Sequence, residues 1–365
     1  MKITCQREEL REALSVISAV VPARGAKPIL ETLKLIATED GLELVGTDLE
    51  VSARISVKEA QVDEAGVVVL PCKVALDFVR DLFSETVTIS CEEDKCIIRG
   101  GTDQCELVTL DADEYPVISH FSEKDSFSLQ GGNFSRLVQQ TAFAAARDGG
   151  RYAMHGVMVE IADDEVKMIA TDGRRLALAS QPLDGDGRNS SAIVPTKGLQ
   201  LFSRVIEDPL DQVKISFDQN QAGIQTQNAQ IFARLIDGDF PHYSAVLPKE
   251  GEHLMEADRD LLSQKLRLVA NVTGDEARAV RLTISKGKLE LKGHCVGRGS
   301  ADAQLEVEYS GDGSEIAFNP DYVLEGLKQC QTETVRLEFQ QRSSPGKFIL
   351  GENYIYIVMP ITIDA

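Results

Sequence analysis

Hydrophobic and polar residues alternate along this chain with two different periods. Leu10, Leu14 and Ile17 recur at the spacing of one helix face, which predicts an amphipathic helix near the N-terminus. Segments 33–36 and 42–45 are short, apolar and separated by turn residues, which predicts an antiparallel hairpin. The two patterns together predict an α+β fold with antiparallel sheets.

The same order of elements returns twice further along the chain. Helical spacing recurs in two segments, at Phe134, Leu137, Val138 and Thr141 in one and at Leu261, Leu262, Leu268 and Val269 in the other. Hairpin patterns follow at 157–169 and 282–291. A second helix and further hairpins complete each copy. Every copy therefore contains the order strand, helix, strands twice in succession.

Landmarks at equal intervals set the length of the repeat. Similar segments begin at Pro71, Pro195 and Asn319, each 124 residues after the one before. Thr47-Asp48 and Thr171-Asp172 keep the same interval. Coincidence among common turn patterns would explain one such match more easily than several in register. We therefore predict three domain-sized repeats, 1–124, 125–252 and 253–365.

Composition argues against several classes of protein. Hydrophobic residues make up 43% and charged residues 26%, as in ordinary folded domains. No apolar run reaches 18 residues and the N-terminus lacks an apolar signal core, so neither a membrane span nor secretion is expected. The 7 cysteines form no CxxC pair, which fits neither a disulfide framework nor a zinc site. We expect a cytoplasmic protein with reduced thiols.

The net charge of −20 by itself argues against nucleic acid as a partner. The placement of the basic groups modifies this expectation. On a helical wheel, Arg136, Gln139, Gln140 and Arg147 gather opposite the apolar side of the second repeat's first helix, and Lys197, Gln200, Ser203 and Arg204 do the same on its next helix. One interpretation is a solvated face without a partner. The other is a surface for sequence-independent contact with phosphates.

A search for catalytic motifs finds little. The chain contains no GxxxxGK[ST] loop, GxGxxG turn, HExxH pair or GxSxG elbow. Asp172, Arg174 and Arg175 could form a phosphate-binding or acid/base loop, but the counterpart segment 47–50 lacks the arginines. A turn between strands is the simpler interpretation. We expect no catalytic residues, no metal and no cofactor.

Several motifs in fixed order carry a family resemblance. They are Pro28-Ile29-Leu30, Gly46-Thr47-Asp48-Leu49-Glu50, the segment from Ala170 to Leu176, the segment from Asp237 to Tyr243, and Tyr356-Ile357-Val358-Met359-Pro360. With them, the chain resembles the bacterial DNA sliding clamp, the β subunit of DNA polymerase III, over essentially its whole length. Each motif is short, but their order and spacing together are specific.

The resemblance implies half of a homodimeric ring, with antiparallel sheets outside and paired helices inside, around double-stranded DNA of any sequence. It implies a non-catalytic processivity subunit for DNA replication. Its expected partners are the replicative polymerase α subunit, the clamp-loader δ subunit and other proteins with a clamp-binding motif. Topological enclosure would hold the DNA without strong attraction, so the acidic balance is no objection.

The resemblance also implies site residues. The peptide-binding groove would comprise Met154, Thr171, Gly173, Arg174, Arg175, Leu176, Pro241, Val246, Asn319, Tyr322, Val358, Met359 and Pro360. Leu176, Val246, Val358 and Met359 would form its apolar floor, and Asn319 and Arg175 would hydrogen-bond the peptide. The expected DNA contacts are Arg24, Arg136, Arg147, Tyr152, Lys197 and Arg204. The dimer contact would join the edge strand around Leu107 to the helix end around Val272.

Two other functions remain open at this stage. The first is a peptide-binding scaffold that does not encircle DNA. The second is an enzyme that acts on phosphorylated substrates through Asp172, Arg174 and Arg175.

Overall fold

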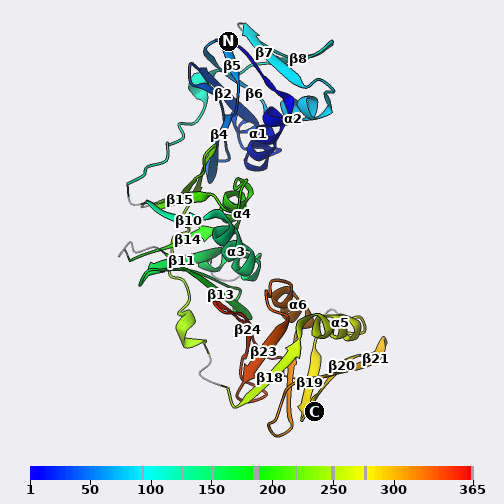
Figure 1. Cartoon of the computed structure of the whole chain (residues 1–365). Helices are drawn as coiled ribbons and strands as arrows, with labels where there is room; N and C mark the ends of the chain where they lie inside the picture. The colour runs from blue at the N-terminus through cyan, green and yellow to red at the C-terminus, as the bar shows by residue number, and fades with distance from the viewer. Residues whose placement is uncertain are drawn as a thin grey trace. The chain divides into compact units, whose positions relative to one another are not determined.

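The computed structural model describes residues 1–92, 94–124, 126–148, 152–183, 189–218, 220–247, 251–274 and 278–362 of the 365-residue chain. Its elements follow the order that the sequence predicts in each repeat (Figure 1). Every pairing between the described strands is antiparallel, which confirms the predicted α+β class. No helix within these ranges is long and apolar enough to cross a membrane.

The bounds of the elements are as follows. The first repeat contains β1 (Lys2–Gln6), α1 (Arg7–Val20), η1 (Pro28–Glu31), β2 (Thr32–Thr38), β3 (Gly41–Thr47), β4 (Val51–Val57), β5 (Gln61–Glu64), β6 (Gly66–Pro71), α2 (Cys72–Asp81), β7 (Thr86–Glu92), β8 (Lys95–Gly100), β9 (Asp103–Val108) and η2 (Ala112–Glu114). The second contains β10 (Ser126–Gln130), α3 (Gly131–Thr141), η3 (Ala142–Ala144), η4 (Tyr152–His155), β11 (Gly156–Ala162), β12 (Glu165–Thr171), β13 (Arg175–Pro182), β14 (Ser190–Pro195), α4 (Thr196–Arg204), β15 (Gln212–Phe217), β16 (Gln221–Gln225), β17 (Ala229–Arg234) and η5 (Tyr243–Ala245). The third contains β18 (His253–Asp258), α5 (Arg259–Ala270), β19 (Val280–Ser285), β20 (Lys288–Cys295), β21 (Gly299–Glu306), β22 (Ser314–Phe318), α6 (Pro320–Lys328), β23 (Thr334–Phe339), β24 (Gly346–Gly351) and β25 (Tyr354–Val358).

The described strands form four sheets. Their orders are β5-β1-β7-β8-β9, β10-β15-β16-β17-β4-β3-β2-β6, β14-β11-β12-β13-β25-β24-β23-β18 and β21-β20-β19-β22. The two long sheets each combine four strands from one repeat with four from the next. The junctions are the pairs β17–β4 and β13–β25.

This sharing of sheets explains how the chain divides. It forms two compact units, one of Met1–Ser135 with Lys197–Leu235 and the other of Arg136–Thr196 with Ile236–Ala365. The central repeat contributes to both units, because its strands β10 and β15–β17 belong to one long sheet and β11–β14 to the other.

The two junctions use the same register. Ile231 of β17 lies opposite Ala53 of β4, and Tyr356 of β25 lies opposite Ala177 of β13. Ala53 and Ala177 lie 124 residues apart, Ile231 and Tyr356 lie 125 apart, and each of the four is the third residue of its strand. Neighbouring repeats are therefore joined by one construction used twice.

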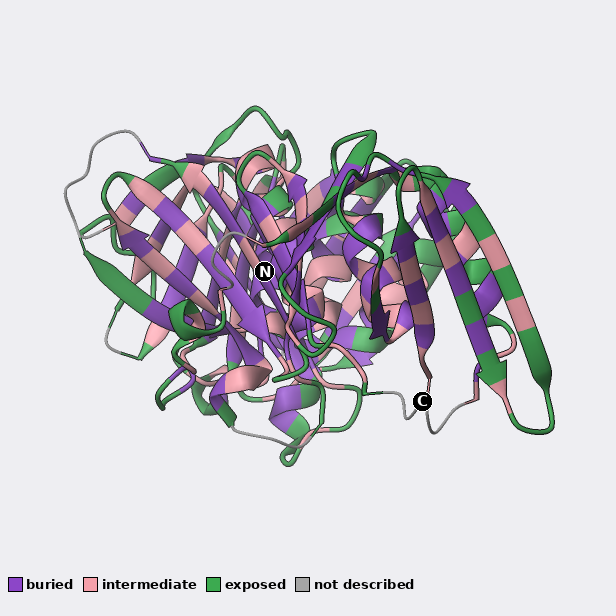
Figure 2. Cartoon of the chain, turned by 90° about the horizontal axis from the view of Figure 1, so that it is seen from below, coloured by how far each residue is buried: buried purple, intermediate pink, exposed green. Residues whose placement is uncertain are grey.

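Helices cover one face of the sheets, and their apolar residues fill the core. Figure 1 shows α1 beside α2 and α5 beside α6, and both pairs are in contact. Leu10, Leu14 and Ile17 are buried, as their spacing predicts. Figure 2 shows the buried positions concentrated in strands and helices, with exposed turns between them.

Two helical predictions were wrong in detail. In α5 the buried leucine and valine side chains are those of Leu262, Leu266 and Val269, whereas Leu261 and Leu268 are exposed. The buried three are spaced i, i+4 and i+7, which is one face of a helix. In the second repeat, Gln140 is only 4% exposed, and α3 ends at Thr141 before a 3₁₀ turn. The helical wheel that grouped Gln140 and Arg147 with Arg136 therefore does not apply there.

Candidate functional site

A cavity of about 220 Å³ lies in the second unit, next to the junction of β13 and β25. It is lined by Met154, Thr171, Gly173, Arg175, Leu176, Pro241, Tyr243, Val246, Ile357 and Met359. Eight of these positions belong to the groove that the sequence predicts. Sequence analysis did not include Tyr243 and Ile357 in that groove.

The loop between β12 and β13 is held by its own side chains. Thr171 Oγ1 donates a 2.6 Å hydrogen bond to the Arg175 carbonyl, and the Asp172 carboxylate accepts from the backbone N–H groups of Arg174 and Arg175. Gly173 has φ +85°, a conformation that costs a residue with a Cβ. Asp48 accepts from two backbone N–H groups in the same way in the first repeat. Asp172 is thus a turn residue, as its counterpart predicts.

Apolar side chains of two adjacent strands form the cavity floor. Leu176 of β13 lies directly opposite Ile357 of β25, and both are almost completely buried. They belong to one cluster with Ala153, Ile169, Ile193, Ile236 and Phe240. Of the four expected floor residues, Leu176, Val246 and Met359 line the cavity and Val358 does not. Successive side chains of a strand point to opposite faces, so the neighbour of Ile357 faces the other side of the sheet.

Arg175 is buried, and its guanidinium is bonded within the chain. Nε donates to Asp172 at 3.0 Å and Nη2 donates to the Phe143 carbonyl at 3.0 Å, while Nη1 donates to Glu325. The centre of the Tyr322 ring lies 4.6 Å from the guanidinium carbon. These contacts fix the wall of the cavity and connect β13 to α6.

The protonation of Arg175 follows from the same surroundings. Burial opposes its charged form, but Tyr356 and the carboxylate of Glu325 outweigh burial and raise its pKa above the ordinary value. The positive charge of Arg175 is therefore permanent in the physiological range.

Tyr243 supplies a polar group at the edge of the apolar cavity. Its hydroxyl donates a 2.5 Å hydrogen bond to Glu160 Oε2. Burial of the phenol and the adjacent Glu160 raise the pKa of Tyr243 to about 12. The side chain is thus a neutral phenol at physiological pH and stays fixed by its bond to β11. Its place in the motif that ends at residue 243 was the available sequence signal.

The remaining groove residues lie beside the cavity without lining it. Asn319 caps α6 by accepting from Asp321 N at 2.9 Å, and Tyr322 packs on Arg175. Arg174 is exposed, and a hydrogen bond with Tyr322 raises its pKa. Pro360 follows β25 and precedes Ile361, whose N–H donates to the Ala317 carbonyl at 2.8 Å.

The expected DNA contacts are all exposed, and they are distributed over both units. Arg24, Lys197 and Arg204 belong to the first unit and Arg136, Arg147 and Tyr152 to the second. Tyr152 is 66% exposed. Lys197 pairs with Asp48, and Arg147 lies 4.0 Å from Glu325. The cations are therefore partly balanced by carboxylates.

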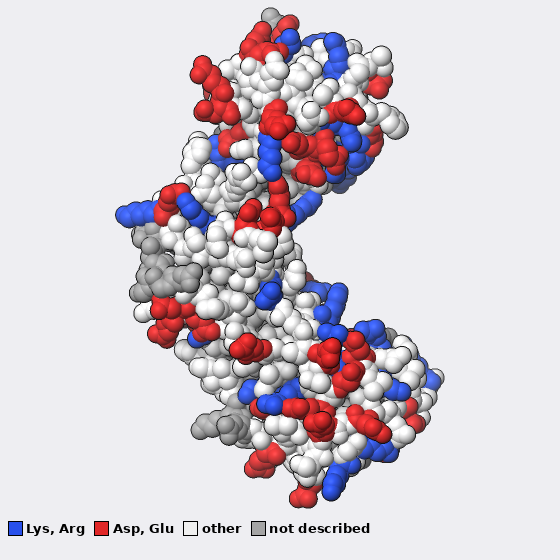
Figure 3. Space-filling model, in the orientation of Figure 1, with Lys and Arg blue, Asp and Glu red and all other residues white. Residues whose placement is uncertain are grey.

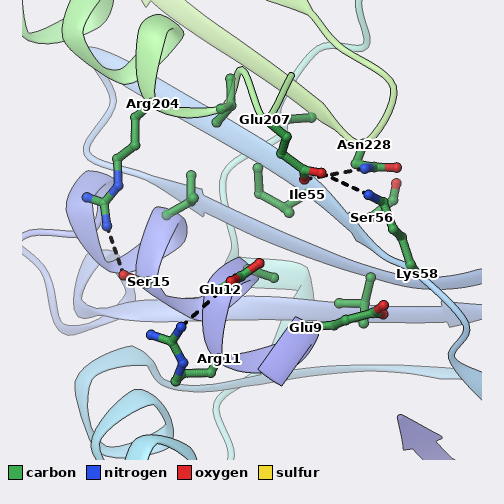
Figure 4. Close-up of a pocket in the computed structure, with 15 residues that line it drawn as sticks. Glu9, Arg11, Glu12, Ser15, Ile55, Ser56, Lys58, Arg204, Glu207 and Asn228 are labelled. Atoms are coloured by element: carbon green, nitrogen blue, oxygen red, sulfur yellow. Dashed lines mark hydrogen bonds and ion pairs between the residues drawn. The ribbon is translucent and has the colours of Figure 1, made fainter. Parts of the chain in front are cut away.

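Arg204 lines a second cavity, of about 370 Å³, in the first unit. Figure 4 shows the Arg204 side chain reaching from α4 toward Ser15 of α1. Arg204 Nη2 donates a 2.8 Å hydrogen bond to the Ser15 hydroxyl. Glu9, Glu12 and Glu207 line the same cavity, and Lys58 pairs with Glu207 at 2.9 Å. Figure 3 shows acidic and basic side chains interspersed on the face of the molecule seen in that view. This cavity has a mixed electrostatic character rather than a strongly basic one.

The two positions expected at the dimer contact lie in different settings. Leu107 of the edge strand β9 is buried in the core of its own repeat, while the next residue, Val108, is 71% exposed. Val272 is half-buried just after the end of α5.

Comparison with known proteins gives three consecutive family matches. The N-terminal, central and C-terminal domain models of the DNA polymerase III beta subunit match residues 1–119, 128–242 and 244–361. The beta sliding clamps of Pseudomonas putida and Escherichia coli K12 are each 30% identical to this chain, with full coverage of both chains.

Solved structures agree with these matches. The DNA polymerase III subunit beta of Pseudomonas aeruginosa superposes with a TM-score of 0.93 at 30% identity, and the sliding clamp of Bacillus subtilis with 0.95 at 25% identity. Both comparisons cover 100% of each chain. With its three clamp domains, this chain belongs to the DNA polymerase III beta subunit family, the bacterial sliding clamps of DNA replication.

Proposed function

We propose that two copies of this chain close head to tail into a ring around duplex DNA and tether the replication machinery to it. The ring is a non-catalytic processivity subunit in the cytoplasm. Each copy contributes three clamp domains with boundaries near residues 124 and 252. The observation that carries the proposal is that β9 and β21, the strands equivalent to those paired at the two junctions, are edge strands among the described residues.

Each repeat contains two strands of the kind that join neighbouring repeats, and four of these six are paired across a junction within the described residues. β17 of the second repeat pairs with β4 of the first, and β25 of the third pairs with β13 of the second. By their order within the three repeats, β9 is equivalent to β17 and β25, and β21 is equivalent to β4 and β13. β9 and β21 are sheet edges in this chain. Exposed edges pair with other strands, and a head-to-tail contact closes a ring when its rotation permits.

The shared register of the two junctions extends to this third contact. Pairing third residue with third residue in the same way places Cys105 of one subunit opposite Ala301 of the partner subunit, and Leu107 opposite Gly299 of the partner subunit. The dimer contact near Leu107 is then a continuous antiparallel sheet, with Val272 near the same boundary.

The cavity beside Leu176 and Ile357 is the proposed docking site for partner peptides. An apolar floor with a few fixed polar groups at its rim suits a short segment with bulky apolar side chains. We propose that the polymerase α subunit, the clamp-loader δ subunit and other clamp-motif proteins bind there. Met359 and Val246, which are 39% and 40% exposed, are the accessible anchors of this site.

Contact with DNA is proposed for Arg24, Arg136, Arg147, Tyr152, Lys197 and Arg204. Cations contact phosphates without reading sequence, and neighbouring carboxylates weaken the attraction. Weak contact permits sliding, while enclosure prevents release.

Retention on DNA of different topology tests the proposal. The assembled clamp, loaded on nicked circular DNA, should remain bound during gel filtration and should be lost after the circle is linearised. Equal retention on linear DNA would contradict enclosure. Peptide binding without retention on either DNA would instead indicate a scaffold that does not encircle DNA.

A further inference from the structure

Three cysteines lie on one face of the first repeat's sheet β5-β1-β7-β8-β9. Cys91 is on β7, Cys96 on β8 and Cys105 on β9. Cys91 lies directly opposite Cys96, and Cys96 lies directly opposite Leu107, two residues from Cys105. Directly opposed residues share a face of the sheet. We propose that Cys91 and Cys96 form a redox-active dithiol that closes to a cross-strand disulfide.

The backbone hydrogen bonds identify the kind of pair that these residues form. Cys91 N donates to the Met1 carbonyl at 2.9 Å, so the backbone of Cys91 faces β1 rather than β8. The Asp94 carbonyl accepts from Thr109 N at 3.1 Å, so the backbone of Asp94 faces β9. Alternate residues of a strand direct their backbone hydrogen bonds to the same side, so the backbone of Cys96 also faces β9. Cys91 and Cys96 are therefore a non-hydrogen-bonded pair.

This geometry suits a disulfide. In non-hydrogen-bonded antiparallel pairs the Cα atoms are about 4.5 Å apart, within the usual disulfide range of about 4.4–6.8 Å. Cys96 and Cys105 are diagonal neighbours, at about 7–8 Å, which lies outside it. The bond can therefore form between Cys91 and Cys96 without movement of the strands.

The two thiols differ in access and acidity. Cys91 is half-buried, whereas Cys96 is 0% exposed. A hydrogen bond from the Cys96 thiol and the nearby N-terminal ammonium lower the pKa of Cys91, against the opposing effect of burial. By contrast, the hydrogen bond with Cys91 and burial raise the pKa of Cys96, and burial raises the pKa values of Cys5 and Cys72 to about 12. An accessible, more acidic thiol beside a buried second thiol is the arrangement of attacking and resolving cysteines.

The reaction needs an oxidant, for which a small-molecule disulfide suffices. The Cys91 thiolate attacks one sulfur of that disulfide, a mixed disulfide forms, and one small thiol leaves with the proton that Cys91 lost. Cys96 then gives up its proton, attacks Cys91 Sγ and releases the second small thiol. Two protein thiols are oxidised and one small disulfide is reduced to two thiols.

Peptide mapping after treatment with oxidised glutathione tests the proposal on the folded full-length protein. Trypsin cuts after Arg80, Lys95 and Arg99, so the disulfide would join peptide 81–95 to peptide 96–99. The intact mass should fall by about 2 Da for one disulfide, and dithiothreitol should restore it.

Three serine variants separate the roles of the thiols. Cys105→Ser should keep the linked peptides, Cys91→Ser should lose them, and Cys96→Ser should retain glutathione on Cys91 because no resolving thiol is left. Absence of the linked peptides from the oxidised wild-type protein, or their loss in Cys105→Ser, would overturn the inference. Neither result depends on ring closure or DNA retention.

Discussion

Arg175 on β13 and Glu325 on α6 form an ion pair that joins the second repeat to the third. The Arg175 side chain is 6% exposed, and its guanidinium also donates to Asp172 and to the Phe143 carbonyl. The same residue borders the candidate peptide cavity. The wall of that cavity is thus built on a contact between repeats.

Removal of this guanidinium should destabilise the second unit. We expect Arg175→Ala to lower the free energy of unfolding by about 3 kcal/mol, the low end for breaking a buried pair, because Glu325 keeps some access to water. Urea unfolding followed by circular dichroism measures the change. The exposed neighbour provides the control, since Arg174→Ala should change stability by about 0.5 kcal/mol or less. Equal effects of the two variants would argue against a structural role for the network.

The cavity should lose affinity when its exposed anchor is shortened. Met359→Ala removes apolar contact at the rim without emptying the core, so peptide binding should weaken by about 1–2 kcal/mol, or roughly tenfold. Titration of a labelled clamp-motif peptide by fluorescence anisotropy measures this. Leu178→Ala is the matched control, because Leu178 packs on the same cluster but does not line the cavity. A larger loss in the control than in Met359→Ala would place the peptide elsewhere.

The proposed ring contact can be trapped covalently. In the carried-over register, Ala301→Cys introduces a thiol opposite Cys105 of the partner subunit, in a non-hydrogen-bonded pair where cross-strand disulfides fit. Mild oxidation should yield covalent dimers on a non-reducing gel.

Two further variants test the register of that contact. Asp302→Cys, one residue away, should give few covalent dimers because its side chain points to the other face. Adding Cys105→Ser to Ala301→Cys should abolish them. Efficient trapping by Asp302→Cys alone would show that the register is shifted.

The Tyr243 phenol should lose its proton at a higher pH than an ordinary tyrosine. Its folded pKa of about 12 exceeds the ordinary value of 10.0, so folding favours the neutral phenol. The stability that this provides is fully present below pH 10 and is lost as the pH rises toward 12. Absorbance at 295 nm, compared between the wild-type protein and Tyr243→Phe, isolates this transition. A difference curve centred near pH 10 would refute the bond to Glu160.

Sequence periodicity predicted most of the fold, because repeated turns and alternating apolar residues are local features. Leu10, Leu14 and Ile17 are buried as their spacing indicates. The prediction from periodicity failed where one local pattern was compatible with two different buried faces. Leu261 and Leu266 are both leucines of one helix, and only packing against the sheet decides that Leu266 is the buried one. The wheel drawn through residue 147 failed because α3 ends at Thr141.

For the site, motifs identified the loop at 171–176 and the end of β25, but the face of each residue depended on strand pairing. Val358 and Ile357 are adjacent in sequence and similar in chemistry. Only the pairing of β13 with β25 determines that Ile357 joins Leu176 in the cavity floor.

The sequence by itself determined three repeats, their antiparallel hairpins and the family, since these follow from spacing and local side-chain chemistry. Tertiary structure decided which strands pair between repeats, and therefore which edges stay open and which thiols lie opposite each other. That decision is not local, because pairing of β17 with β4 or of β13 with β25 joins residues more than a hundred positions apart.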